Sequence, residues 1–186
     1  MAELDAPSDV FVSGGEIYIA DTNNHRVRKV LRNGQITTIA GTGIRGYNGD
    51  GQLATNAQLD CPYSVVVSSS AQVYILEFSR IRKIDRNGII STIAGTGNEG
   101  FNGDDQLATH AHLYNPRGLF VTDDEEVLFA DTFNHRVRKV DRNGIISTIA
   151  GNENQGYNGD DQLATNASLD NPTSVFQYKN EIYRFQ

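Results

Sequence analysis

The sequence is poor in the features that form disulfides, cysteine-based zinc sites or membrane-spanning helices. It has a single cysteine, Cys61, and no tryptophan. One thiol cannot form an intrachain disulfide, and it cannot supply the paired cysteines of a zinc site. No run approaches the roughly 18 apolar residues of a membrane-spanning helix, and the start, MAELDAPSDV, lacks the basic and apolar regions of a signal peptide. The formal net charge of -7 argues against a nucleic-acid surface, which is usually basic.

Proline is also scarce, and its positions reveal an internal repeat. The chain has only four prolines, Pro7, Pro62, Pro116 and Pro172, which lie 55, 54 and 56 residues apart. Two further markers recur 54 and 56 residues apart, Ile-Ala-Gly at Ile39, Ile93 and Ile149, and Asn-Gly-Asp at Asn48, Asn102 and Asn158. Three markers that agree in spacing indicate a repeated structural unit.

Each repeat contains four runs that are typical of β-strands. In the first copy these are DVFVS from Asp9, EIYIAD from Glu16, RVRKV from Arg26 and QITTIAG from Gln35. The second run is apolar on both of its alternating faces, which is typical of a strand that is covered on both sides. An Asn-Gly pair separates the third and fourth runs and predicts a tight type I′ hairpin turn. Each unit is therefore predicted to be a meander of four antiparallel strands.

Four strands per unit, repeated in series, predict an all-β fold of the β-propeller class. The predicted domain is a single propeller segment over residues 1–186. Its four-stranded blades are expected at about 8–41, 64–95 and 118–151, with half a blade at about 174–186 and long connecting segments at 42–63, 96–117 and 152–173. Three blades and a half cannot close a ring alone. We therefore expect either a fragment of a longer protein, which we favour, or self-association through open blade edges.

The residues that follow the second strand identify a family resemblance. YIADTNNHRVRKV, with ITTIAGTG and GYNGDG after it, resembles the NHL-repeat propellers, and the chain carries the Asn-His pair at Asn24-His25 and Asn134-His135. The second copy keeps the flanking strands but lacks this pair and is two residues shorter there. The resemblance extends over essentially the whole chain. It implies a propeller of NHL type, a family in which some members bind single-stranded RNA.

The long connecting segments are predicted to fill the seams between blades. GDGQLATNAQL contains Leu53, Ala54, Ala57 and Leu59 at spacings that suit one face of a short helical piece. The same positions recur in the other two segments, at Leu107, Ala108, Ala111 and Leu113 and at Leu163, Ala164, Ala167 and Leu169. Each segment also has to carry the chain from the outer edge of one blade to the inner strand of the next.

An acidic residue at the end of each second strand is followed by an arginine. The pairs are Asp21 with Arg26, Glu77 with Arg80 and Asp131 with Arg136. We expect them to be structural ion pairs across the turn, because the guanidinium fork suits a carboxylate. The alternative is a ring of exposed polar groups that binds a ligand.

The turns after the second strands and the long segments emerge at the same end of a four-stranded meander. This loop-rich face is the predicted binding surface, and its candidate residues are Asn24, His25, Asp50, Asp104, Asn134, His135 and Asp160. The aspartates that follow Asn-Gly could alternatively belong to a calcium loop, but no late glutamate completes one. The simpler interpretation is a turn that is closed on its own backbone.

The sequence as a whole predicts a non-catalytic module that presents this face to a protein or another ligand, with no catalytic residue, metal or cofactor. A propeller lyase or hydrolase with an axial metal is one alternative, but the inner strands offer almost no histidine or carboxylate for it. An RNA-binding face is the other, suggested by the basic runs at Arg26, Arg80 and Arg136. The acidic loops argue against it, because phosphate binding needs a positive field.

Overall fold

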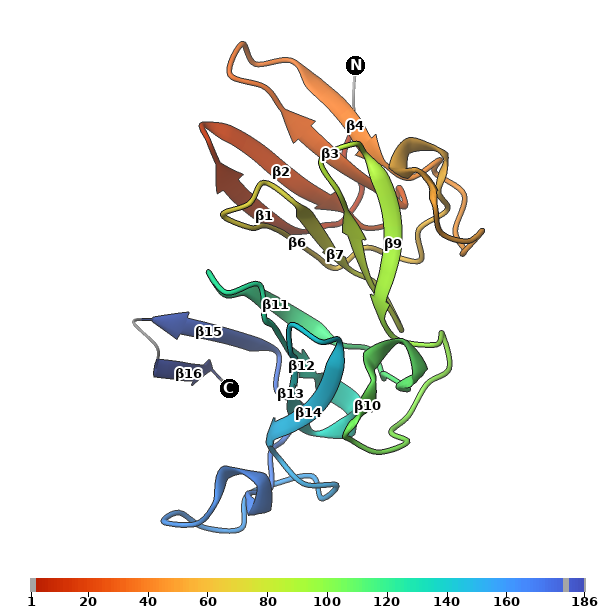
Figure 1. Cartoon of the computed structure of the whole chain (residues 1–186). Helices are drawn as coiled ribbons and strands as arrows, with labels where there is room; N and C mark the ends of the chain where they lie inside the picture. The colour runs from red at the N-terminus through yellow and green to blue at the C-terminus, as the bar shows by residue number, and fades with distance from the viewer. Residues whose placement is uncertain (1–2, 179–180, 186) are drawn as a thin grey trace. The chain divides into compact units, whose positions relative to one another are not determined.

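A computed structural model describes residues 3–178 and 181–185, and its fold is all-β, as the repeat predicts (Figure 1). The chain divides into two compact units, Met1–Thr92 and Ile93–Gln186. In the first unit, one sheet has the order β1-β2-β3-β4. Its strands are β1 (Pro7–Ser13), β2 (Glu16–Asp21), β3 (Arg26–Val30) and β4 (Ile36–Ala40), all antiparallel to their neighbours.

The next sheet has the order β5-β9-β8-β7-β6 and therefore contains one strand more than the sequence predicts. Its strands are β5 (Gln52–Leu53), β6 (Ser64–Val67), β7 (Val73–Leu76), β8 (Ile81–Ile84) and β9 (Ile89–Ala94). The additional strand, β5, comes from the long connecting segment and pairs with the outer strand β9. The connecting segment thus covers an edge that would otherwise expose unpaired backbone groups.

The second unit repeats this arrangement. Its five-stranded sheet has the order β10-β14-β13-β12-β11, and a two-stranded sheet of β15 and β16 follows. The strands are β10 (Gln106–Leu107), β11 (Arg117–Val121), β12 (Val127–Asp131), β13 (Arg136–Val140), β14 (Ile145–Ala150), β15 (Ser174–Tyr178) and β16 (Glu181–Phe185). Within the described residues, no helix is long and apolar enough to span a membrane.

The hairpins between third and fourth strands differ from the predicted turn type. Only the glycine of each Asn-Gly pair has a positive φ, for example 84° at Gly34, whereas a type I′ turn requires it at both residues. The Gly34 N–H donates to the Leu31 carbonyl, and the Leu31 N–H donates to the Gln35 carbonyl. This is the pattern of a longer hairpin loop with a left-handed glycine at its end. The prediction of a hairpin was right, but the prediction of type I′ was wrong.

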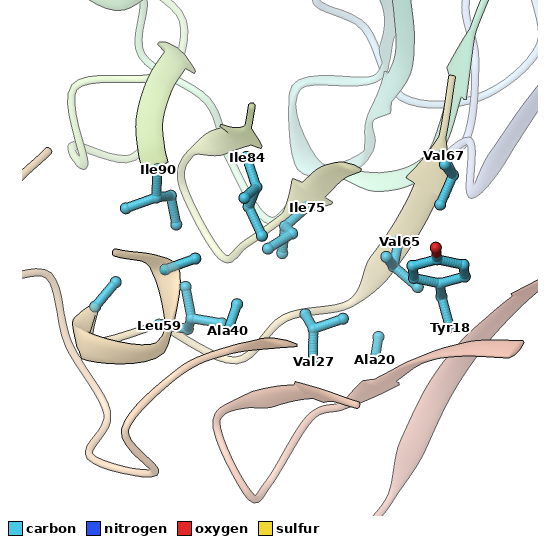
Figure 2. Close-up of a cluster of buried hydrophobic side chains, with 12 residues drawn as sticks. Tyr18, Ala20, Val27, Ala40, Leu59, Val65, Val67, Ile75, Ile84 and Ile90 are labelled. Carbon is cyan, nitrogen blue, oxygen red and sulfur yellow. The ribbon is translucent and has the colours of Figure 1, made fainter. Parts of the chain in front are cut away.

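The predicted packing role of the long segment is confirmed in the first unit (Figure 2). Ala54, Ala57 and Leu59 are buried in one cluster with side chains of both neighbouring sheets. The first sheet contributes Tyr18, Ala20, Val27 and Ala40, and the second contributes Val65, Val67, Ile75, Ile84 and Ile90. Figure 2 shows Leu59 beside Ala40, and Tyr18 beside Val65. Burial of this apolar surface is the main force that holds the two sheets together.

One member of the predicted helical face lies elsewhere. Leu53 is half exposed because it belongs to the short strand β5, and the helical piece is only a single 3₁₀ turn, Ala54–Asn56. Ala108–His110 and Ala164–Asn166 form the same 3₁₀ turn in the other segments. Each segment is also held by backbone hydrogen bonds, such as the one from the Gly41 N–H to the Ala54 carbonyl (3.0 Å).

Gly41 illustrates why the Ile-Ala-Gly marker recurs. Its φ is 93°, and a Cβ added there would lie 2.2 Å from the His25 carbonyl oxygen. Gly151 is equally close to the carbonyl oxygen of His135, with a φ of 88°. No residue with a side chain fits at either place, so the marker records a close backbone approach at the end of the outer strand.

Candidate functional site

In the first and third repeats, the turn after the second strand of the sheet is hydrogen-bonded to the part of the chain that precedes the sheet. In the second unit, the buried carboxylate of Asp131 accepts hydrogen bonds from the Tyr114 N–H (2.9 Å) and from Asn134 Nδ2 (2.9 Å). Asn134 Nδ2 also donates to the Gly100 carbonyl (2.7 Å). Asn24 binds Asp21 and the Glu3 carbonyl in the same way in the first unit. The predicted ligand residues Asn24 and Asn134 are thus engaged in internal hydrogen bonds.

The same turn also holds the segment that follows. The backbone N–H of Asn171 donates to Nδ1 of His135 (3.3 Å), and the backbone N–H of Cys61 donates to Nδ1 of His25 (3.3 Å). An imidazole that accepts at Nδ1 is neutral, and burial, followed by the charge of Arg45, lowers the pKa of His25 accordingly. Both histidines have left-handed backbone conformations. Both predicted binding residues thus make an internal contact through Nδ1, and their role in binding stays a prediction.

Replacement of Thr132 tests this connection. Thr132 is buried, and its hydroxyl donates to the Pro172 carbonyl (2.9 Å), as Thr22 does to the Pro62 carbonyl (2.8 Å). Thr132→Val keeps the shape but leaves the carbonyl without a donor, so the free energy of unfolding should fall by about 1 to 3 kcal/mol. Urea unfolding measures this. Thr165→Val, at a position that has no such contact, is the control and should change stability by less than about 0.5 kcal/mol. Equal stability of the two variants would contradict the assigned role.

The acidic residues at the strand ends form ion pairs with a different arginine from the one predicted. Asp131 Oδ2 lies 3.3 Å from Arg138 Nη1, Glu77 Oε1 lies 3.6 Å from Arg82 Nη1, and Asp21 Oδ2 lies 3.5 Å from Arg28 Nη1. The predicted partners Arg26, Arg80 and Arg136 stand two residues earlier in the chain. Arg26 and Arg136 each donate from Nη1 to a backbone carbonyl of the turn, at Asn24 and Asn134.

The aspartates after Asn-Gly complete these ion pairs. Asp104 Oδ1 accepts from Arg138 Nη2 at 2.9 Å, and Asp50 Oδ1 accepts from Arg82 Nη2 at 2.8 Å. Both arginine side chains are fully buried. Asp160 instead accepts from the Tyr157 hydroxyl at 2.8 Å. Neither the calcium loop nor a turn closed on its own backbone describes Asp50 and Asp104, which bind an arginine from a distant strand.

The sequence did not predict an aromatic contact that accompanies these ion pairs. The guanidinium of Arg136 lies 3.9 Å from the ring centroid of Phe101, and that of Arg80 lies 4.1 Å from the ring centroid of Tyr47. Both are cation–π distances. The signal was present, because an aromatic residue precedes each Asn-Gly-Asp. Arg80 and Arg136 are therefore each held against an aromatic ring at the loop-rich end of their sheet.

The second unit has a hollow beside this stack, with a volume of about 320 Å³. It is lined by Phe101, Asp104, Arg136, Thr148, Gly151, Asn152, Glu153, Asn154 and Thr165. Of the residues predicted to bind a ligand, only Asp104 lies here. Arg136, which was predicted to be structural, also lines it. The hollow combines a cation, two carboxylates, two amides, two hydroxyls and one aromatic ring.

Several polar atoms of this hollow have no partner among the described residues. Thr148 Oγ1 is buried without a hydrogen bond, whereas the equivalent hydroxyl of Thr92 donates to Asp50 Oδ1 at 3.1 Å. Arg136 uses Nη1 alone, whereas Arg26 also donates from Nη2 to the Thr42 carbonyl at 2.8 Å. Buried polar groups normally have partners. Two residues that line the hollow thus lack hydrogen bonds that their equivalents in other repeats make.

The third repeat departs from the other two at this place. Glu153 occupies the position of Gly43 and Gly97, and Asn152 occupies the position of Thr42 and Thr96. In the first repeat Gly43 has a φ of 90°, and a Cβ there would lie 2.2 Å from Arg26 Nη2. Glu153 is not among the residues with a positive φ, so the backbone of the third repeat differs at this position.

The formal charge is concentrated in the unit that contains the hollow. Residues 93–186 include seven Lys and Arg against fourteen Asp and Glu, whereas residues 1–92 include nine of each kind. The whole excess of -7 thus belongs to the second unit. Within the described part of the chain, no three His, Cys, Asp or Glu side chains are arranged to hold a metal ion.

Solved structures support the propeller fold. An auxiliary nutrient binding protein from Bacteroides ovatus matches with a TM-score of 0.68 over 93% of this chain and 43% of that chain, at 20% identity. A streptogramin B lyase matches with a TM-score of 0.59 over 91% of this chain and 44% of that chain, at 13% identity. At such identities the similarity concerns the fold alone.

Sequence comparisons identify the family. The model of the teneurin NHL domain matches residues 43–102 and 97–171, and the NHL repeat model matches residues 4–30. Teneurin-3 of Danio rerio is 35% identical over 44% of this chain and 4% of its own length. NHL repeat-containing protein 2 of Gallus gallus is 28% identical over 94% of this chain, which spans 28% of that relative. The chain belongs to the NHL-repeat family and has its β-propeller fold.

Proposed function

We propose that this chain is a non-catalytic interaction module that binds a protein partner through the loop-rich end of its sheets. The hollow beside Phe101 and Arg136 is the binding site. The observation that carries this proposal is the set of unused polar atoms there, Thr148 Oγ1 and Arg136 Nη2, beside an aromatic ring. Mixed donors and acceptors around a ring suit an extended peptide, which offers both kinds of group along its main chain.

The loop-rich end is a rigid support for such a site. Arg136 is fixed by its hydrogen bond to the Asn134 carbonyl (2.9 Å) and by its contact with Phe101. Asp104 is fixed by Arg138, whose side chain is fully buried. Side chains held in this way lose little conformational freedom on binding, which favours affinity.

Selection from a random dodecapeptide library displayed on phage tests the proposal. We expect the chain to enrich peptides whose binding weakens at least about tenfold in Arg136→Gln, because a hydrogen bond to a charged group is removed from the site. Arg142→Gln, at the opposite end of the same sheet, is the matched control and should bind as the parent does. Failure to enrich any peptide, or equal binding by the two variants, would reject the hollow as a protein-binding site.

A random single-stranded RNA pool provides the comparison with the other binding class. Its binding to the second unit is expected to be weak at physiological salt, since that unit carries twice as many acidic as basic residues. Tight binding that falls steeply with added salt would instead assign the module to nucleic acid.

A further inference from the structure

We infer that the hollow of the third repeat selects a basic peptide, one that brings a lysine or arginine side chain to Glu153 while its main chain pairs with Arg136 and Thr148. The inference rests on the proposed function and adds the chemical class of the partner. It depends on three features of the second unit: a carboxylate that the other repeats lack, unused polar atoms of both kinds, and the local charge.

Glu153 is the first of these features. The two other repeats have glycine at its position. In the described structure the Glu153 side chain is exposed at the hollow and makes no hydrogen bond or ion pair. Burial, followed by the charge of Arg138, lowers the pKa of Arg136, and the charge of Glu153 acts against this shift. Asp104 adds a second carboxylate, of which Oδ1 is occupied by Arg138. Two carboxylate groups at one hollow can hold the cationic side chain of a partner.

A purely acidic hollow would select only a cation, but this one also contains donors. Arg136 Nη2 faces no acceptor among the described residues, and a peptide carbonyl supplies one. The buried Thr148 hydroxyl accepts or donates, and either suits a peptide N–H or carbonyl. The donors and acceptors of the hollow therefore match those of a peptide main chain, while Glu153 binds the cationic side chain of the peptide.

The net negative charge of the second unit also favours a basic peptide. With fourteen acidic against seven basic residues, this unit attracts cations at long range and raises the association rate of a basic peptide. Such attraction alone would be unspecific, so the experiment has to separate the local charge of Glu153 from the charge of the unit.

Two fluorescent peptides with acetylated and amidated ends are suitable probes, one of Gly-Ser-Lys repeats and one of Gly-Ser-Glu repeats. We expect the lysine peptide to bind the intact chain in fluorescence anisotropy and the glutamate peptide not to bind. Glu153→Gly, which restores the residue of the other repeats, should weaken lysine-peptide binding about fivefold. Asp123→Asn removes the same charge at an exposed site between β11 and β12, at the other end of the strands, and should weaken it less than about twofold.

The outcomes separate this inference from the proposed function. Equal weakening by Glu153→Gly and Asp123→Asn, or binding of the glutamate peptide, would overturn the basic class, while library peptides that depend on Arg136 would leave the interaction module intact. In backbone amide spectra, the lysine peptide should shift the signals of Asn152 and Asn154 more than those around Asp123. Shifts spread evenly over the second unit would equally reject a site at Glu153.

Discussion

Replacing Arg138 by methionine is expected to lower the free energy of unfolding by about 3 to 5 kcal/mol, the range seen when one partner of a buried ion pair is removed. The Arg138 side chain is fully buried, and its two terminal nitrogens contact Asp131, Asp104 and the Gly103 carbonyl. Methionine fills much of the volume but provides no donor. Asp131 would then remain buried with only neutral hydrogen-bond donors, so urea unfolding should show the loss.

Arg142→Met is the matched control, because Arg142 also pairs with an aspartate but at an exposed site. Its partner is Asp124, and both side chains are largely exposed. Exposed ion pairs contribute about 0 to 1 kcal/mol, so this variant should unfold close to the parent. Adding Asp131→Asn to Arg138→Met removes the uncompensated charge and should restore part of the stability. If the two single arginine variants lost the same amount, burial of the ion pair would not be the cause.

The ion pairs of Arg138 could not be predicted from the sequence, although the repeat could. The repeat, the four-stranded meanders and the seam residues Ala57 and Leu59 follow from spacing and apolar pattern alone, because such patterns reflect local geometry. The arginine that pairs with each carboxylate at the end of a second strand does not follow from these patterns. Arg136 and Arg138 share one face of β13, and which of them reaches Asp131 depends on how Phe101 and Asp104 approach from the preceding segment. That approach is a tertiary feature.

The candidate site was even less visible in the sequence. Identical turns predicted a binding face at Asn134 and His135, yet both are used to hold neighbouring segments. The hollow depends on an unused hydroxyl and an unused guanidinium edge, and neither property is visible in a residue type. One signal was available: Glu153 replaces the glycine of the other repeats. Among near-identical copies, it is this departure, and not the repeated residues, that lies at the proposed site.

The shortened turn of the second repeat leads to the other large effect, a dependence of stability on pH. This turn lacks the Asn-His pair, and Glu77 stands where the other repeats have aspartate. Glu77 is fully buried, and neither of its carboxylate oxygens has a hydrogen-bond partner within the described residues. Burial raises the pKa of Glu77 to about 8, against which the charges of Arg82 and Arg80 act, while Asp60 adds to the rise.

The ion pair with Arg82 does not cancel the rise in the pKa of Glu77. Glu77 Oε1 is 3.6 Å from Arg82 Nη1, whereas Asp50 Oδ1 is 2.8 Å from Arg82 Nη2. Asp50 is also partly exposed, and its contact with the arginine is the shorter of the two. Two carboxylates share one guanidinium, and Glu77, which is fully buried, is the one whose pKa burial raises. Asp131 differs, because the Tyr114 N–H and Asn134 act against the rise in its pKa that burial causes.

Glu77→Gln should therefore be less sensitive to pH than the parent chain. A pKa that is higher in the folded than in the unfolded state means that the folded chain binds more protons, so the Glu77 contribution is complete below about pH 4.5 and is lost as pH rises towards about 8. Within this window the stability of the parent relative to Glu77→Gln should fall by at most about 1.4 kcal/mol per pH unit.

Urea unfolding of both proteins at several pH values measures the difference, in which common groups such as His25 cancel. Glu16→Gln, at a partly exposed ion pair with Lys29, should run parallel to the parent. Parallel curves for Glu77→Gln as well would mean that Glu77 stays ionised in the folded chain and that Arg82 compensates both carboxylates.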